Sequence, residues 1–265
     1  MATHYDVSLR HGVDFDFRLD GKAAVVTGGL GGIAMATNEA LIRKGARVAI
    51  FYPRFEEDRV PAAIAALGAE HVAAFACNVA DESDVAAAVE AAAARLGDLH
   101  LLINAAGTIT LTAAEDVTLD EWRRQLDVNL TGPFLCSKHF ARHVFARGHR
   151  AKIINIASQA ATVAIDHHCA YTSAKAGLIG MTKTLAKEWS RRGITVNAIS
   201  PTVVLTPMGA AAWDGEKGER MKDLIPVGRF AYTDEIAAAI LFLASNGADM
   251  INGADLMIDG GYTIY

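Results

Sequence analysis

Short apolar runs alternate with stretches of helical periodicity along almost the whole chain. Most of the apolar runs are continuous, which is typical of strands in a parallel sheet that helices cover on both faces. Seven runs predict strands: Ala23–Thr27, Arg47–Tyr52, His71–Cys77, Leu99–Asn104, Lys152–Ala157, Thr195–Ser200 and Asp255–Ile258. The stretches between them predict helices, among them Val85–Leu96, Leu119–Arg147, Tyr171–Arg192 and Asp234–Ser245. This alternation indicates a doubly wound α/β sheet with right-handed crossovers.

The chain has no internal repeat and no long linker rich in proline, glycine or serine. We therefore predict a single domain over residues 21–265, preceded by an N-terminal extension, residues 1–20, that docks on a neighbour or frays. The polar stretch Thr206–Asp223 has few helix signals and follows the sixth strand. Open α/β sheets bind ligands at that edge, so this stretch predicts a substrate lid near residues 203–225, with an ordinary surface loop as the alternative.

Charge and apolar content narrow the class of protein. Lys and Arg number 25 against 30 Asp and Glu, a formal charge of −5, which argues against a nucleic-acid partner. The longest apolar stretch, Ile236–Ala244, is far shorter than the ~18 residues of a membrane span, and Met1–Arg10 lacks a secretory signal. Cys77, Cys136 and Cys169 are odd in number and widely spaced, which predicts three buried thiols in a reducing compartment. We expect a cytoplasmic protein with neither membrane nor nucleic-acid partners.

A glycine-rich turn follows the first predicted strand and precedes a helix. Glycine allows a sharp turn and a close approach of the backbone to a pyrophosphate, and the N-terminus of the helix favours the anion. The turn therefore predicts a dinucleotide site that includes Gly28, Leu30, Gly32 and Ile33.

The second predicted strand ends at Tyr52, where a dinucleotide fold usually carries an acid that holds the adenosine ribose. The missing carboxylate and the nearby Arg54 would accommodate a 2′-phosphate, whereas Glu56–Asp58 would cancel that charge. Tyr52 serves equally well as a cover for the adenine edge. The choice between NAD and NADP therefore stays open.

Tyr171 and Lys175 lie four residues apart, on one face of a predicted helix. An ammonium beside a phenol lowers the phenol's pKa from about 10, which makes tyrosine a usable general acid or base near neutral pH. Ser158 ends the fifth predicted strand and can hydrogen-bond the oxygen of a reacting carbonyl or alcohol. These three residues predict the catalytic centre.

The ordered motifs make the chain resemble the short-chain dehydrogenase/reductases, enzymes with a Rossmann-type fold, from Leu19 to Gly261. By this resemblance Tyr171 is the proton donor and acceptor, Ser158 anchors the substrate oxygen, and Lys175 lowers the Tyr171 pKa and binds the nicotinamide ribose. Asn129 would hold a water that connects Lys175 to solvent, and NAD(P)(H) would be the cofactor. The motifs that carry the resemblance are Thr27–Ala34, Asn104–Gly107, Asn129, Ser158, Tyr171 with Lys175, Ser200–Pro201 and Ile258–Gly261.

Three positions depart from the family pattern: Ala34 and Thr202 each replace a glycine, and Asn78 replaces an aspartate that faces adenine. An amide can still accept that hydrogen bond. The resemblance extends the expected cofactor site beyond the turn, to Asn78, Val79, Asn104, Ala105, Gly107, Pro201, Val203, Val204 and Thr206.

The segments Ser200–Trp213 and Ile225–Phe230 carry a narrower resemblance, to the L-xylulose/dicarbonyl reductases and bacterial polyol dehydrogenases. Ser158, Gln159 and His168 match the same subgroup, and with Trp213 they are the expected substrate-binding residues. Gln159 and His168 suit a polyhydroxylated substrate, because a site that pairs hydroxyls rejects analogues without them. Alternatively, His167 and His168 are solvated loop residues without a role in binding, and Trp213 only packs within the lid. Two other functions fit the same motifs: a 3-oxoacyl or carbonyl reductase, and a non-catalytic dinucleotide sensor or scaffold.

The resemblance also implies a homo-oligomer, a tetramer or a dimer. No metal is expected: His139 and His143 lie four apart but lack a third ligand, so we interpret them as a solvated helix face.

Overall fold

Seven parallel strands form one sheet in the order β3-β2-β1-β4-β5-β6-β7. The computed structural model describes residues 11–264, and every strand begins and ends within two residues of its predicted bounds. The predicted doubly wound α/β fold is confirmed: the chain adds strands outward from β1 to β3 on one side, then crosses back and adds β4 to β7 on the other side of β1. The strands are β1 (Ala23–Thr27), β2 (Arg47–Tyr52), β3 (Val72–Ala76), β4 (Leu101–Asn104), β5 (Ala151–Ile156), β6 (Ile194–Pro201) and β7 (Asp255–Ile258).

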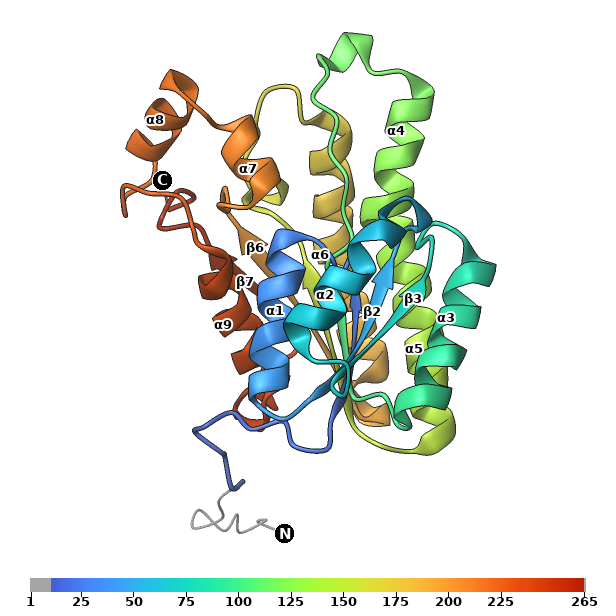
Figure 1. The fold of residues 1–265 in the computed structure, drawn as a ribbon. Helices are drawn as coiled ribbons and strands as arrows, with labels where there is room; N and C mark the ends of the chain where they lie inside the picture. The colour runs from blue at the N-terminus through green and yellow to red at the C-terminus, as the bar shows by residue number, and fades with distance from the viewer. Residues whose placement is uncertain (1–10, 265) are drawn as a thin grey trace, which may run out of the picture.

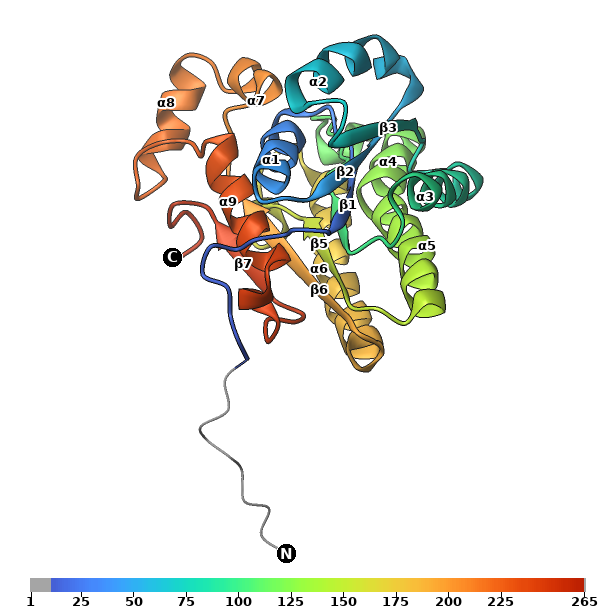
Figure 2. The ribbon, with the colours of Figure 1, turned by 60° about the horizontal axis from the view of Figure 1, so that its bottom comes forward.

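Helices cover both faces of the sheet (Figures 1 and 2). Side chains of α1 (Gly32–Arg43), α2 (Val60–Leu67) and α9 (Thr233–Ala244) join one apolar core. Those of α3 (Glu82–Leu96), α5 (Gly132–Arg147) and α6 (Cys169–Trp189) join the other. Because both faces are buried, the strands could be continuously apolar, as the sequence shows. None of the helices within residues 11–264 is long and apolar enough to cross a membrane.

The prediction of one continuous helix over Leu119–Arg147 was wrong, because the structure has two helices there with a break between them. A capping box at Thr118 starts α4 (Leu119–Leu126), and a π-helical turn, Asp127–Thr131, separates it from α5. Pro133 has no N–H to give to the carbonyl of Asn129 in the ordinary helical pattern, which favours the wider turn at this point. The π-turn brings Asn129 into the buried interior.

The stretch Thr206–Asp223 is not helix-poor: it forms α7 (Pro207–Ala212) and α8 (Glu216–Asp223) above the carboxyl ends of the strands (Figure 1). Thr206 caps α7 by accepting the N–H of Gly209 at 3.0 Å, with proline at the first helical position. In α8, ion pairs three and four residues apart support a helix that has little apolar surface.

Residues 11–20 of the predicted N-terminal extension pack against their own chain; residues 1–10, like Tyr265, lie outside the described residues. The ring of Phe17 lies edge-on to Phe242 of α9, with centroids 5.7 Å apart. Asn246 accepts the N–H of Asp14 at 3.0 Å and donates to the carbonyl of Gly12 at 3.1 Å. Residues 11–20 thus pack against α9 and the turn that follows it (Figure 2).

Candidate active site

The glycine-rich turn between β1 and α1 lets a phosphate approach the backbone closely, because glycine has no side chain to block that approach. Gly28 has a φ of +59°, and a Cβ there would lie 2.7 Å from Cα of Ala106. A Cβ on Gly31 would meet only the carbonyl of Gly28, at 3.3 Å, so this side of the turn is open. No side chain caps α1 at Gly31, so its first N–H groups remain for an anion. The turn fits the pyrophosphate of a dinucleotide.

A depression of about 540 Å³ lies beyond the carboxyl ends of β2 and β3, between Arg54 and Asn78. It brings together Arg54 and Asn78, two residues that the sequence predicts separately at the adenosine end of the cofactor. Phe55 and Asp84 line it too and were missed, because neither belongs to a motif. Asp84 accepts the backbone N–H of Asn78 at 3.1 Å. Tyr52, at the end of β2, is buried and does not line this depression.

The turn is joined to β4 by Thr27, whose hydroxyl accepts the N–H groups of Ala105 and Ala106 at 3.1 Å each. Asn104 is buried, and its amide donates to Asn155 at 2.8 Å and to Ser137 at 3.2 Å. The amide nitrogen of Asn104 is therefore occupied inside the protein, while its Oδ1 is buried without a hydrogen-bond partner among the described residues.

Ser158, Tyr171 and Lys175 meet where β5 ends and α6 begins. Ser158 starts a 3-10 turn, Gln159–Ala161, and its hydroxyl lies within hydrogen-bonding reach of the Tyr171 phenol. Lys175 is 4% exposed, and its Nζ lies 5.6 Å from the centre of the Tyr171 ring. The same Nζ donates to the carbonyl of Ile156 at 2.7 Å. The three predicted catalytic side chains thus share one site.

The ammonium of Lys175 contacts the carbonyl of Ile156, and burial dominates the pKa of both Tyr171 and Lys175. Burial raises the pKa of Tyr171, while the hydrogen bond from Ser158 opposes that rise. Burial also lowers the pKa of Lys175 to about 8. The ammonium faces Ile156 rather than the phenolic oxygen, so here Ser158 is the group that favours the phenolate.

Asn129 and Gly107 form the wall in front of Lys175. The Asn129 amide donates to the carbonyls of Thr108 and Gln125 at 2.8 and 2.9 Å and accepts the N–H of Thr108 at 3.3 Å. A Cβ on Gly107 would lie 3.1 Å from Oδ1 of Asn129 and 3.9 Å from Nζ of Lys175. This cradle, which a side chain would fill, fits a ribose against Lys175. The side chain of Asn129 is used to hold the loop at Thr108. A water at this place would therefore have to hydrogen-bond the backbone of Asn129.

Gln159 and His168 flank the predicted catalytic side chains. Gln159 is 3% exposed, and its Oε1 is buried without a hydrogen-bond partner in the part of the chain described. Nδ1 of His168 is 2.6 Å from the carbonyl of Asp166, which makes Nδ1 the protonated nitrogen and Nε2 the free acceptor. The His168 ring lies 6.1 Å from that of Tyr171 and is buried rather than solvated.

Trp213 lies with the lid instead, in a small apolar cluster with Met221, Ile225 and Phe230. Its ring is 6.3 Å from that of Phe230. Of the remaining predicted cofactor residues, Val203 packs on this cluster and Val204 forms a bridge with Ala231. Thr206 would touch a Cβ placed on Gly32, which brings the start of the lid next to the glycine-rich turn. Pro201 and Val79 are buried.

Two sequence interpretations outside the site need correction. Cys77 and Cys136 are buried as predicted, but Cys169 is exposed because it lies in the first turn of α6. His139 and His143 do not form a solvated face: His139 lies 3.1 Å from Glu82, and His143 accepts the N–H of Leu99 at 3.3 Å.

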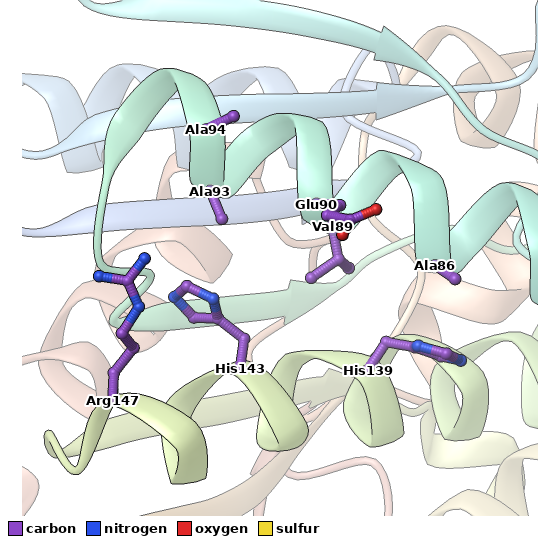
Figure 3. A pocket seen from close by; sticks show the side chains of 8 residues that line it. All are labelled: Ala86, Val89, Glu90, Ala93, Ala94, His139, His143 and Arg147. Atoms are coloured by element: carbon purple, nitrogen blue, oxygen red, sulfur yellow. The ribbon is translucent and has the colours of Figure 1, made fainter.

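Both of these histidines line a cavity of about 510 Å³ between α3 and α5, apart from the predicted site residues (Figure 3). Within residues 11–264 no group of three or more His, Cys, Asp or Glu side chains is placed to hold a metal ion.

Comparison with known proteins places this geometry in a family. Residues 28–263 match the family described as enoyl-(acyl carrier protein) reductase. The chain is 52% identical to D-threitol dehydrogenase of Mycolicibacterium smegmatis, over 95% of this chain and 96% of that protein. It is 42% identical to the NAD-dependent glycerol dehydrogenase of Listeria innocua, over 96% and 98%. A short-chain dehydrogenase/reductase of Serratia marcescens superposes with a TM-score of 0.86 at 36% identity, covering 92% and 99%. The chain belongs to the short-chain dehydrogenase/reductase family, whose members are NAD(P)(H)-dependent oxidoreductases.

Proposed function

We propose that this enzyme interconverts a secondary alcohol and a ketone on a small polyhydroxylated substrate, a sugar alcohol and its ketose. The observation that carries the proposal is the unpaired Oε1 of Gln159, a buried acceptor next to Ser158. A buried acceptor without a donor costs free energy, and a substrate hydroxyl would supply the donor. Two relatives named for threitol and glycerol support the same class of substrate.

Each side chain of the site has a separate role in the reaction. Tyr171 takes the hydroxyl proton in oxidation and returns it in reduction, and Ser158 holds the substrate oxygen through its hydroxyl. Lys175, held against Ile156 and facing the opening at Gly107, binds the ribose. The bound nicotinamide supplies the hydride chemistry. Gln159 and Nε2 of His168 accept hydrogen bonds from neighbouring substrate hydroxyls, and Trp213 closes the site as part of a lid at residues 203–225.

A substrate panel tests this proposal. Tetritols, pentitols, hexitols and glycerol are compared with cyclohexanol and a 3-oxoacyl thioester, each with both dinucleotides, by the absorbance of the reduced nicotinamide. We expect the highest kcat/KM with a polyol. Preference for cyclohexanol or the thioester would replace the proposal with an apolar-ketone reductase, and dinucleotide binding without turnover on any substrate would indicate a sensor or scaffold. Both dinucleotides are needed because Tyr52 leaves no carboxylate at the end of β2, while Arg54 is exposed there.

We also propose a homo-oligomer, a dimer or tetramer, in the cytoplasm. Two apolar side chains on the outer surface of α4 and α5 support the oligomer: Leu119 is 59% exposed and Phe134 is 43% exposed. The free, buried thiols of Cys77 and Cys136 suit a reducing compartment.

Light scattering after size exclusion tests the oligomer. The chain should elute at two or four times its 28.1 kDa mass, and Phe134→Glu should lower that mass. Phe15→Glu, at an 84% exposed position outside these helices, should not change it. A monomeric wild-type protein would contradict the proposal.

A further inference from the structure

The carbonyl groups of the glycine-rich turn are each held by a donor on the protein side. The N–H of Gly31 donates to the carbonyl of Gly28 at 2.9 Å, which closes the turn. The buried amide of Asn38, from α1 itself, donates to the carbonyl of Gly29 at 2.9 Å. The third carbonyl, that of Leu30, accepts a hydrogen bond from the guanidinium of Arg59.

Arg59 comes from a different part of the chain than the other two donors. It ends the 3-10 turn Arg54–Arg59, which follows β2. Its Nη1 forms an ion pair with Glu56 at 2.6 Å, while Nη2 reaches Leu30. A guanidinium presents its donors in a fixed planar fork, so two bonds from one group fix its orientation. Arg59 therefore ties the segment after β2 to the turn before α1.

We infer that Arg59 is a positioning residue for the dinucleotide. A site for pyrophosphate needs backbone N–H groups that face the anion and carbonyl oxygens that face away, since a carbonyl dipole repels phosphate. Arg59 holds the Leu30 carbonyl toward the segment after β2, which leaves the open side of Gly31 and the first N–H groups of α1 for the phosphates. The turn is thus organised before the ligand arrives, and binding costs less conformational freedom. The inference rests on the proposed use of a dinucleotide by this enzyme.

Arg59→Gln tests the inference, with Arg59→Lys as the conservative variant. Calorimetric titration of the ligand-free protein with the preferred dinucleotide should show a Kd about tenfold higher for Arg59→Gln, the factor expected for losing one charge-assisted hydrogen bond. The KM for the dinucleotide should rise in parallel, with kcat at saturation within about twofold of wild type. ADP-ribose, which carries the same pyrophosphate without nicotinamide, should lose affinity by the same factor. Arg59→Lys, which can still donate to Leu30, should recover part of the affinity.

Arg43→Gln is the matched control, because Arg43 pairs with Glu39 on the outer surface of the neighbouring α1. It should leave Kd, KM and kcat unchanged. The inference fails if Arg59→Gln binds the dinucleotide and ADP-ribose like wild type, or if it loses kcat at an unchanged KM. A wild-type protein that binds no dinucleotide would instead overturn the proposed function. Thermal unfolding of each variant without ligand confirms that it is folded.

Discussion

Tyr171→Phe removes one oxygen atom from the site and with it the group that exchanges the proton. Because general acid–base catalysis contributes about 10²- to 10⁴-fold, kcat for a polyol should fall about a thousandfold. The Kd for the dinucleotide should stay within about twofold, since the ring and Lys175 remain in place. Stopped-flow turnover and calorimetric titration measure the two quantities. Turnover close to that of wild type would remove Tyr171 from the chemistry.

Gln159→Leu replaces the buried, unpaired amide with an apolar side chain of similar size. The kcat/KM for a polyol should fall about 10- to 100-fold, because a substrate hydroxyl loses its partner, while that for a simple secondary alcohol should change little. The free energy of unfolding should stay the same or rise, since an unsatisfied amide is removed.

Thr195→Val is the control for Gln159→Leu, because it removes another buried, unpaired oxygen in β6. It should leave the preference between polyol and simple alcohol unchanged. Equal losses for the two substrates with Gln159→Leu would show that Gln159 does not select hydroxyls.

At the residue scale, spacing and position in a strand or helix predicted which side chains meet. They did not predict the hydrogen-bond partners or the pKa shifts of those side chains. Tyr171 and Lys175 share a face because residues four apart lie about one helical turn apart, and Ser158 joins them because it follows a strand. The contact of Lys175 with the Ile156 carbonyl and the pKa directions depend on burial, which no local pattern contains. The same holds for the amide nitrogen of Asn104, which donates to side chains of β5 and α5.

At the scale of elements, the strands were predictable because continuous apolar runs leave little choice of bounds. The π-turn at Asn129 was missed, although Pro133 marks the place where an ordinary helix loses a hydrogen bond. Helix α7 was missed because it is only six residues long, and α8 was missed because it is polar. Thr206, Pro207 and the charge pairs of α8 were the available signals.

The N-terminal segment gives a prediction at this scale. Phe17→Ala should lower the free energy of unfolding by about 1–2 kcal/mol, because Phe17 loses its packing and edge-on contact with Phe242 in α9. Phe15→Ala, two residues away at an 84% exposed position, should change it by less than about 0.5 kcal/mol. Urea denaturation followed by circular dichroism measures both. If the two variants are equally stable, residues 11–20 do not contribute to the fold through α9.

At the scale of the whole molecule, the sheet order follows from the α/β alternation, but contacts between distant elements do not. His100 precedes β4, His143 lies on α5 and His149 follows that helix. Their rings are 5.1 Å apart for His100 and His149, and 6.0 Å for His143 and His149. Nδ1 of His100 accepts the N–H of Ala23 at 3.3 Å, and Nε2 of His149 lies 2.8 Å from the Leu99 carbonyl. Together with the bond from His143 to Leu99, this cluster joins α5 to the amino ends of β1 and β4.

The histidine cluster predicts a loss of stability in mild acid. Burial, with the nearby charge of Lys22 and the His149 ring, lowers the pKa of His100 to about 4 from 6.5. The unfolded chain therefore binds the proton more strongly than the folded one. The stabilisation is complete above pH 6.5 and is lost as the pH falls toward 4. We expect His100 to account for about 2 kcal/mol of that loss, a value reduced by the partial exposure of its ring.

His100→Asn isolates this contribution, because the asparagine Oδ1 can replace Nδ1 as acceptor for Ala23 and does not titrate in this range. The difference in unfolding free energy between pH 7.5 and pH 4.5, from urea denaturation, should be about 2 kcal/mol smaller for His100→Asn than for wild type. His71→Asn, which alters a histidine with a 47% exposed side chain before β3, should keep the wild-type difference. Carboxylates away from the substituted histidines titrate in the same way in all three proteins, so their contribution cancels in the comparison. If His100→Asn and wild type lose the same stability in acid, the proton enters the protein elsewhere and the amino ends of β1 and β4 are not the acid-sensitive part of the fold.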